Sequence, residues 1–302
     1  MPEPLEFSIP PRPQEEPKFW SILLVQLGLF IMGSGLGVLV YMSICTVMGW
    51  DPQLTIGADA TPAERWQVRL QFGLAHLLGF LGSALMVLRI FYPGKVTNYL
   101  RSEKAPGLGN LGLGLLLMLV SLPLVMYTLN LNQQLPLPES LKIAEAQAEE
   151  VLKGLLKMDN LAELLANLSL VAIFPAIGEE LVFRGVVQGQ LMRRIAHPIS
   201  AILLSAAIFS AAHFQFEGFI PRMLLGFFLG WLYWQTKNFW VPVACHFFNN
   251  GLQVVAQYFY ARQMSSIDLE KDIAVPWPFA LMSAFMVWAV MRTIQQQNRA
   301  LE

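Results

Sequence analysis

The sequence predicts an all-α fold: a polytopic membrane protein of about eight transmembrane helices, with an amphipathic helix between spans three and four. Charged residues make up 14% of the 302 residues and hydrophobic residues 55%, whereas about a quarter of a typical soluble domain is charged. The mean hydropathy is +0.49. In addition, the chain contains eight apolar runs of about 17 residues or more, a length with which a helix can cross a bilayer.

The first three predicted spans are long apolar runs. The first is Phe19–Met48, in which Gly33 and Gly37 are four residues apart. This small-xxx-small spacing favours close contact between helices. The second is Leu70–Tyr92, ended by a Pro-Gly pair, and the third is Leu108–Leu131, which follows a glycine-rich stretch.

Residues 132–158 have a different pattern, because charged and apolar residues alternate at helical spacing. This pattern predicts an amphipathic helix in a loop or at the membrane interface. The charged residues are Lys142, Glu145, Glu149, Glu150, Lys153 and Lys157.

The fourth predicted span, Leu161–Met192, carries the stretch "PAIGEELVFRG", and Arg193 and Arg194 mark its exit from the membrane. Four shorter runs follow it. They are Ile199–Phe216, Phe219–Thr236, Phe239–Arg262 and Pro276–Ile294.

We therefore expect four parts. Residues 1–18 contain six prolines and four glutamates and are predicted to be a disordered tail. Residues 19–158 hold the N-terminal spans and the amphipathic loop, 159–262 the charged and histidine-bearing helices, and 263–302 the last span and a C-terminal tail.

Charge and cysteine content exclude other classes of protein. The net charge is −1, from 20 basic and 21 acidic residues, so no long-range field attracts nucleic acid. Cys45 and Cys245 lie in separate apolar segments and do not form a disulfide framework. The expected surroundings are the lipid bilayer.

Three charges stand inside the fourth span. A charged residue at the centre of a membrane helix costs about 2.5 to 3.5 kcal/mol on insertion scales, so it is a functional hypothesis by default. Glu180 and Arg184 are four residues apart and can pair. Glu179 is rotated by about 100° from Glu180 and faces elsewhere. The alternative is an ion-pair network that only holds helices together.

The chain has four histidines, of which His213 and His246 lie in predicted spans and near other polar groups. His213 and Glu179 are each fourteen residues from the turn between spans four and five, which predicts a similar depth, about 21 Å from the turn. His246 and Asn250 are four apart and share one helix face. His76 is interpreted as a core residue, and His197 as a loop residue.

The polar side chains of these spans could together catalyse hydrolysis. They comprise two carboxylates, two imidazoles, a carboxamide and an arginine. A buried carboxylate takes up a proton readily and can act as a base towards water, and histidine and asparagine can donate to an oxyanion. Glu179, His213 and His246 could instead bind a divalent metal such as zinc. The spacing lacks the compact H-E-x-x-H arrangement, so it leaves both readings open.

Three short motifs occur in order on successive predicted spans, and together they resemble one family. The chain is similar to the CPBP intramembrane proteases, also called the Abi or CAAX-protease family, which include the type II CAAX prenyl endopeptidases. The resemblance covers about residues 160–260. Its motifs are EExxxR (Glu179, Glu180, Arg184), FxxxH (Phe209, His213) and HxxxN (His246, Asn250).

The resemblance implies an endopeptidase that cuts a membrane-associated protein or peptide, without a cofactor or, alternatively, with a divalent metal. The acidic, proline-rich tail and the compact loops suggest a bacterial-type member, located in the inner (plasma) membrane. The implied roles are a water-activating base (Glu179), an assisting histidine (His213), supporting partners (Glu180, Arg184) and an oxyanion site (His246, Asn250).

Two other classes remain open from the residues alone. An ion-coupled transporter also uses intramembrane carboxylates, although the chain shows no inverted internal repeat. A non-catalytic membrane scaffold of the same family would use the polar residues only for stability.

Overall fold

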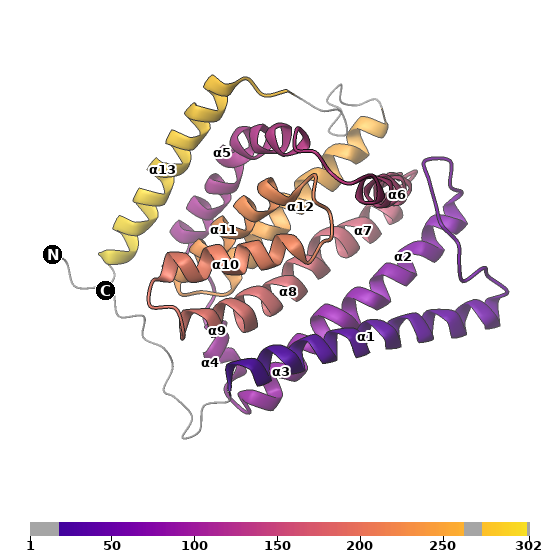
Figure 1. Ribbon diagram of the computed structural model, residues 1–302, viewed down its shortest axis with the longest axis horizontal. Coiled ribbons are helices and arrows are strands. Elements are labelled where there is room, and N and C mark those ends of the chain that lie inside the picture. Colours follow the sequence, from indigo (N-terminus) through magenta and orange to yellow (C-terminus); the bar gives the residue numbers. More distant parts are fainter. Residues whose placement is uncertain (1–17, 263–273, 301–302) are drawn as a thin grey trace.

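The computed structural model describes residues 18–262 and 274–300, and all of its regular elements are helices. The predicted disordered tail lies, apart from Lys18, outside the described residues. Figure 1 shows α1 (Phe19–Met48) and the helix that follows it on one side of the molecule and α13 (Trp277–Arg299) on the other. The remaining helices lie between them.

The second long helix runs continuously over residues 62–91 and consists of α2 (Pro62–His76), a π-type segment (Leu77–Gly82) and α3 (Ser83–Phe91). It begins eight residues before the predicted Leu70. The physical reason is a capping box, in which the Thr61 side chain accepts from the Glu64 amide and the Glu64 carboxylate accepts from the Thr61 amide. The span predicted from apolar residues did not include this first turn, because the turn is polar.

α1 and this second helix pack closely through the glycines that the sequence indicated. A Cβ added at Gly37 would lie 3.0 Å from the carbonyl oxygen of Leu74 and 3.1 Å from Cα of Ala75. The absence of a side chain therefore lets the two backbones approach, and the predicted close contact is confirmed.

A short helix, α4 (Val96–Leu100), leads to α5 (Leu108–Gln133), which packs against α13. α6 (Glu139–Leu156) lies within the predicted amphipathic segment and is outside the candidate spans. The expected amphipathic helix is thus confirmed.

The fourth long helix covers residues 161–192, as predicted, and contains α7 (Leu161–Asn167), α8 (Phe174–Glu180) and α9 (Gly189–Met192). Two π-type segments, Leu168–Ile173 and Leu181–Gln188, connect these parts. π-type turns interrupt the regular i to i−4 ladder and occur often at functional sites. Here they flank the two adjacent glutamates.

Three inner helices complete the fold: α10 (Pro198–Ala211), α11 (Phe219–Thr236) and α12 (Trp240–Ala261). α10 and α11 lie against each other, because Gly226 on α11 has no side chain. A Cβ there would be 2.9 Å from the ring of Phe209 on α10. This contact sets the position of the end of α10, where His213 follows.

Five helices of the described residues are long and apolar enough to cross a membrane, whereas eight were predicted. They are α1, residues 62–91, α5, residues 161–192 and α13. α10 is only 14 residues long, and α11 and α12 are less apolar, because α11 carries Arg222 and α12 carries His246, Asn249 and Asn250. The chain is a polytopic, all-helical membrane protein.

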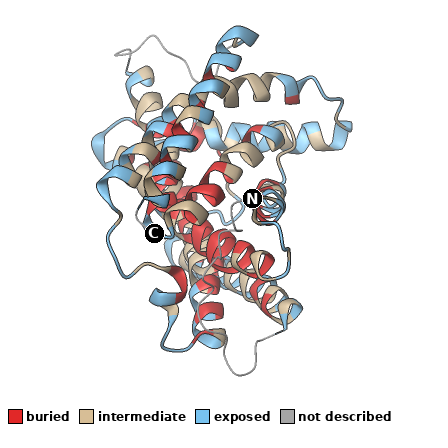
Figure 2. Cartoon of the chain, turned by 90° about the vertical axis from the view of Figure 1, so that its left-hand side faces the viewer, coloured by how far each residue is buried: buried red, intermediate tan, exposed pale blue. Residues whose placement is uncertain are grey.

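The outer surface supports this assignment. On α1, Trp20 is 69% exposed and Met32 70%, and on α13 Phe285 is 65% exposed. Exposed apolar faces of this extent are unusual in soluble monomers but suit contact with lipid. Figure 2 shows that the buried residues concentrate on the central helices instead.

A buried cluster of charges joins α2 to α7. The carboxylate of Glu163, which is fully buried, lies 3.0 Å from Nη2 of Arg65 and 2.9 Å from Nη1 of Arg69. Arg65 also pairs with Asp159, and Arg69 donates to the side-chain oxygen of Asn167 at 2.8 Å. Each charge in the cluster is therefore compensated.

Replacing Glu163 with Gln is expected to destabilise the fold by about 3 kcal/mol or more, because two buried guanidinium groups lose their shared carboxylate. Thermal unfolding in detergent measures this. The control is Glu149→Gln, which removes an ion pair with Lys153 on exposed α6 and is expected to change the midpoint little. Equal midpoints for the two variants would contradict the structural role of Glu163.

A second prediction concerns the helix crossing at Gly37. Gly37→Val is expected to lower the unfolding midpoint, because the new side chain meets the Leu74 backbone. Gly35→Val on the same helix is the matched control, since nothing lies within 4 Å of a Cβ at Gly35. If both variants unfold at the same temperature, the crossing does not depend on this glycine.

Candidate active site

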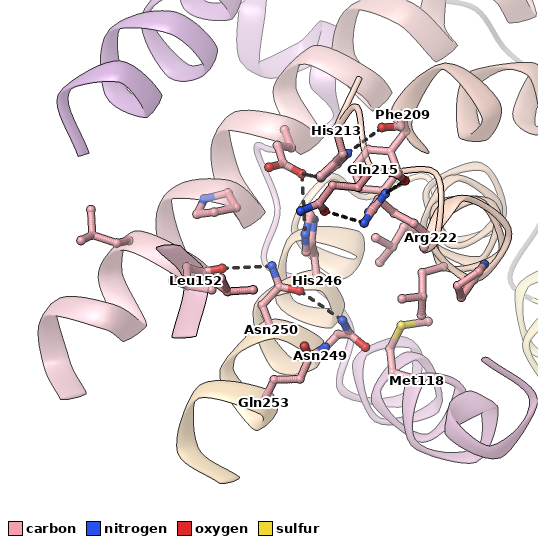
Figure 3. A pocket seen from close by; sticks show the side chains of 18 of the residues that line it. Met118, Leu152, Phe209, His213, Gln215, Arg222, His246, Asn249, Asn250 and Gln253 are labelled. Carbon is pink, nitrogen blue, oxygen red and sulfur yellow. Dashed lines mark hydrogen bonds and ion pairs between the residues drawn. The ribbon is translucent and has the colours of Figure 1, made fainter. Parts of the chain in front are cut away.

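A pocket of about 500 Å³ lies between the long central helix, α6, α11 and α12. Figure 3 shows its lining side chains converging from several helices. All four residues that the sequence singled out as catalytic line it, together with polar residues that were not given a role. The first set is Glu179, His213, His246 and Asn250, and the second includes Gln215, Arg222, Asn249 and Gln253.

Glu179 and two histidines meet in this pocket. One carboxylate oxygen, Oε2 of Glu179, lies 3.9 Å from Nε2 of His213 and also 3.9 Å from Nε2 of His246. Glu179 and His246 are 7% and 5% exposed. The depth match predicted for Glu179 and His213 is confirmed, and His246 reaches the same point.

The other ring nitrogen of each histidine fixes its tautomer. Nδ1 of His213 lies 2.9 Å from the carbonyl oxygen of Phe209, and since a carbonyl can only accept, this nitrogen carries the proton. Nδ1 of His246 lies 3.0 Å from Oε1 of Glu180 and donates to that carboxylate. In the neutral ring, each Nε2 therefore presents a lone pair towards Glu179.

Glu180 links two of the other polar residues. Its Oε2 forms an ion pair with Nε of Arg184 at 2.8 Å, although the angle falls short of a hydrogen bond. Glu180 and Arg184 are fully buried, and the guanidinium also lies over the ring of Phe209 at 5.3 Å. The predicted i, i+4 pair is confirmed. The contact between Glu180 and His246 was not predicted.

Asn250 is held by a backbone carbonyl of the π-type segment Leu168–Ile173. The carbonyl is that of Val171, and Pro175, four residues further on, has no N–H to donate to it. The side-chain Nδ2 of Asn250 donates to that carbonyl at 3.0 Å, and its Oδ1 accepts from Asn249 at 3.1 Å. The carboxamide is thus oriented on the pocket wall, on the same helix as His246.

The turn that carries His213 differs from the prediction. The expected span continued to Phe216, but α10 ends at Ala211. Phe214 has φ of 54°, in the left-handed region, and its amide bonds back to Ala211 in a tight turn. An irregular loop of residues 212–218 therefore presents His213, instead of a helix.

Two side chains from other helices hold this loop. The carboxylate of Glu145 on α6 accepts from the amides of Phe216 at 2.6 Å and Glu217 at 3.1 Å. Asn132 on α5 donates to the Phe216 carbonyl at 2.7 Å and accepts from the Ile220 amide at 2.6 Å. These bonds satisfy backbone groups that the loop would otherwise leave unpaired.

The remaining two histidines do not line the pocket. His76 stacks on Phe80 at 4.7 Å and lies behind the site, where a Cβ added at Gly178 would be 3.3 Å from its Nε2. His197 is exposed in the loop before α10. The interpretation of His197 as a loop residue is confirmed, whereas His76 is partly buried and its Nε2 has no hydrogen-bond partner among the described residues, so it is not the satisfied core residue expected. No role was predicted for Arg222, although it is a charged residue inside a predicted span.

The distances between Glu179 and the two histidines bear on the alternative of a metal site. Ligands about 2.0 to 2.2 Å from a tetrahedral zinc lie roughly 3.4 Å from one another, whereas Oε2 of Glu179 is 3.9 Å from each Nε2. In the described part of the chain, no group of three His, Cys, Asp or Glu is close enough to hold a metal. The donor types fit zinc, but they would have to move closer.

Comparisons with known proteins agree with the motifs. Residues 161–252 match the Rce1-like type II CAAX prenyl endopeptidase family. The chain is 31% identical over 86 residues to the "Putative membrane peptidase YdiL" of Bacillus subtilis (strain 168), an alignment that covers 28% of this chain and 35% of that relative. No solved structure matches the chain. Residues 161–252 therefore form a domain of the Rce1-like CAAX endopeptidase family.

Proposed function

We propose that this protein is an intramembrane endopeptidase that hydrolyses a peptide bond of a membrane-associated protein or peptide. The observation that carries the proposal is the meeting of one Glu179 oxygen with two unprotonated imidazole nitrogens, 3.9 Å from each, at the wall of a pocket. The match of residues 161–252 to an endopeptidase family supports it.

In the proposed reaction Glu179 is the base. A water molecule that donates to Glu179 and to Nε2 of His213 is oriented by both acceptors. Glu179 takes one proton as the water oxygen attacks the scissile carbonyl carbon. It then returns that proton to the amine nitrogen as the carbon–nitrogen bond breaks. No covalent intermediate with the enzyme is needed.

His246 and Asn250 are proposed to stabilise the oxyanion. Asn250 gives one amide hydrogen to Val171 and keeps a second for the negative oxygen. His246 can donate from Nε2 only when protonated, and the Glu180 carboxylate beside its Nδ1 stabilises that imidazolium. Glu180 and Arg184 would therefore act through His246.

The metal-dependent alternative uses the same residues. Glu179, His213 and His246 would hold a divalent ion, which supplies a Lewis acid that activates water and polarises the carbonyl. In that case Glu180 orients the ligand His246 through Nδ1, as a carboxylate commonly does for a metal-bound histidine.

We also propose the membrane setting. α10, α11 and α12 would lie within the membrane beside the five longer helices, with exposed apolar side chains such as Leu204 and Phe247 towards lipid, which gives the predicted total of eight. Residues 159–262 would form the catalytic part and residues 19–158 a supporting part. The expected location is the inner membrane of a bacterium.

The first functional prediction concerns the catalytic residues. Glu179→Gln, His213→Ala and His246→Ala are each expected to reduce cleavage of a membrane-tethered reporter by at least about 100-fold, because each removes proton transfer or charge stabilisation. Cleavage is measured in membranes, and expression is checked by immunoblot. His197→Ala is the matched histidine control and is expected to cleave normally.

Full cleavage by Glu179→Gln would contradict the proposal. A scaffold would give no product with any variant, while the same substitutions lower thermal stability. A transporter would show Glu179-dependent uptake into liposomes and no proteolysis.

The second functional prediction separates the two mechanisms. With a metal-free mechanism, dialysis against a chelator is expected to leave the cleavage rate of the purified protein unchanged. Elemental analysis of the same sample gives the metal content. Loss of activity that zinc restores would establish the metal-dependent alternative instead.

A further inference from the structure

Arg222, on the first turn of α11, is a charged side chain of the pocket for which the proposed reaction has no use. It is half-buried and lines the same pocket as Glu179, His213 and Asn250. Figure 3 shows it beside Gln215, on the side of the pocket where His213 lies. Its position is therefore next to the atoms that would react.

The guanidinium of Arg222 is held in place by neutral groups. Nη1 donates to the carbonyl oxygen of Gln215 at 3.1 Å, and Nη2 donates to its side-chain oxygen at 2.9 Å. A guanidinium has five N–H donors, so these two bonds orient it and leave other donors for a ligand. Gly218 makes room for it, since a Cβ there would lie 2.9 Å from Nη2.

Within the described part of the chain no carboxylate lies within ion-pair distance of the Arg222 guanidinium, and those of Glu179 and Glu145 act on its charge only from farther away. The fully buried guanidinium groups of the described residues behave differently: Arg65 and Arg69 share Glu163, and Arg184 pairs with Glu180. A positive charge in a site of low dielectric is costly unless an anion compensates it.

We infer that Arg222 binds a carboxylate of the substrate, and that the pocket thereby selects peptides with a negative charge close to the scissile bond. This inference rests on the proposed function. The planar guanidinium matches a carboxylate with two parallel hydrogen bonds. A pocket of about 500 Å³ holds only a few residues, so the carboxylate belongs to a residue near the cut.

That carboxylate can be the C-terminal group of the substrate or the side chain of Asp or Glu. The two sources present the same planar anion to Arg222. They differ in position along the peptide, and peptides with a blocked C-terminus distinguish them.

Binding is measured with the full chain in the Glu179→Gln background, so that no cleavage is needed. The probes are N-acylated apolar hexapeptides in three forms: with a free C-terminus, with a C-terminal amide, and with a C-terminal amide plus one Asp. At least one carboxylate form is expected to bind about tenfold tighter than the neutral amide, the size of one charge-assisted hydrogen bond. The form that gains affinity identifies the source.

Substitutions then assign the preference to Arg222. Arg222→Gln is expected to remove the preference for carboxylate peptides over amide peptides. Arg222→Lys is expected to retain part of this preference, because a lysine keeps the charge without the planar pair of donors. Gly218→Ala is expected to weaken it by displacing the guanidinium. Arg292→Gln, which removes an arginine on α13 outside the pocket, is the matched control and keeps the full preference.

The inference is overturned if carboxylate and amide peptides bind equally, if no peptide binds, or if the preference survives Arg222→Gln. In the active enzyme, Arg222→Gln is expected to raise KM for carboxylate substrates about tenfold with little change in kcat, whereas a loss confined to kcat would contradict a binding role. Absence of Glu179-dependent cleavage, with an Arg222-dependent binding preference intact, would instead refute the proposed function alone.

Discussion

The candidate site depends on the buried carboxylate of Glu180. It pairs with Arg184 on one side and accepts from Nδ1 of His246 on the other, so it compensates the buried guanidinium and fixes the tautomer of the histidine. Among the described residues, no Lys or Arg is in ion-pair contact with its neighbour Glu179, which faces the pocket. In the proposed reaction the two glutamates would divide electrostatic support and chemistry, because consecutive helical residues point in directions about 100° apart.

Much of this arrangement follows from the sequence, because the rules involved are local or count residues along straight helices. The first and fourth long helices match their predicted bounds at Phe19–Met48 and residues 161–192. The pair of Glu180 and Arg184 follows from i, i+4 spacing. The depth match of Glu179 and His213 follows from equal distances to one turn.

Other features could not be predicted, because they depend on tertiary contacts. α10 ends at Ala211 since the loop after it is held by Glu145 and Asn132, which are distant in sequence. The contact of His246 with Glu180 requires the packing of α12 on α8. α11 and α12 fall short of the apolarity of a span, and on α12 the polar His246 and Asn250 bind groups of the long central helix.

The short length of α10 has a consequence for how water reaches a reaction inside a membrane. Fourteen residues extend about 21 Å, whereas the hydrocarbon core is about 30 Å thick. If α10 crosses the membrane as proposed, with the surface at Arg193 and Arg194, the loop after α10 would lie below the opposite surface. Non-helical backbone at such depth is tolerated only inside protein or beside a water-filled cavity. In the proposed membrane setting, the short helix would leave a hydrated indentation through which water, the second reactant, enters from the aqueous phase.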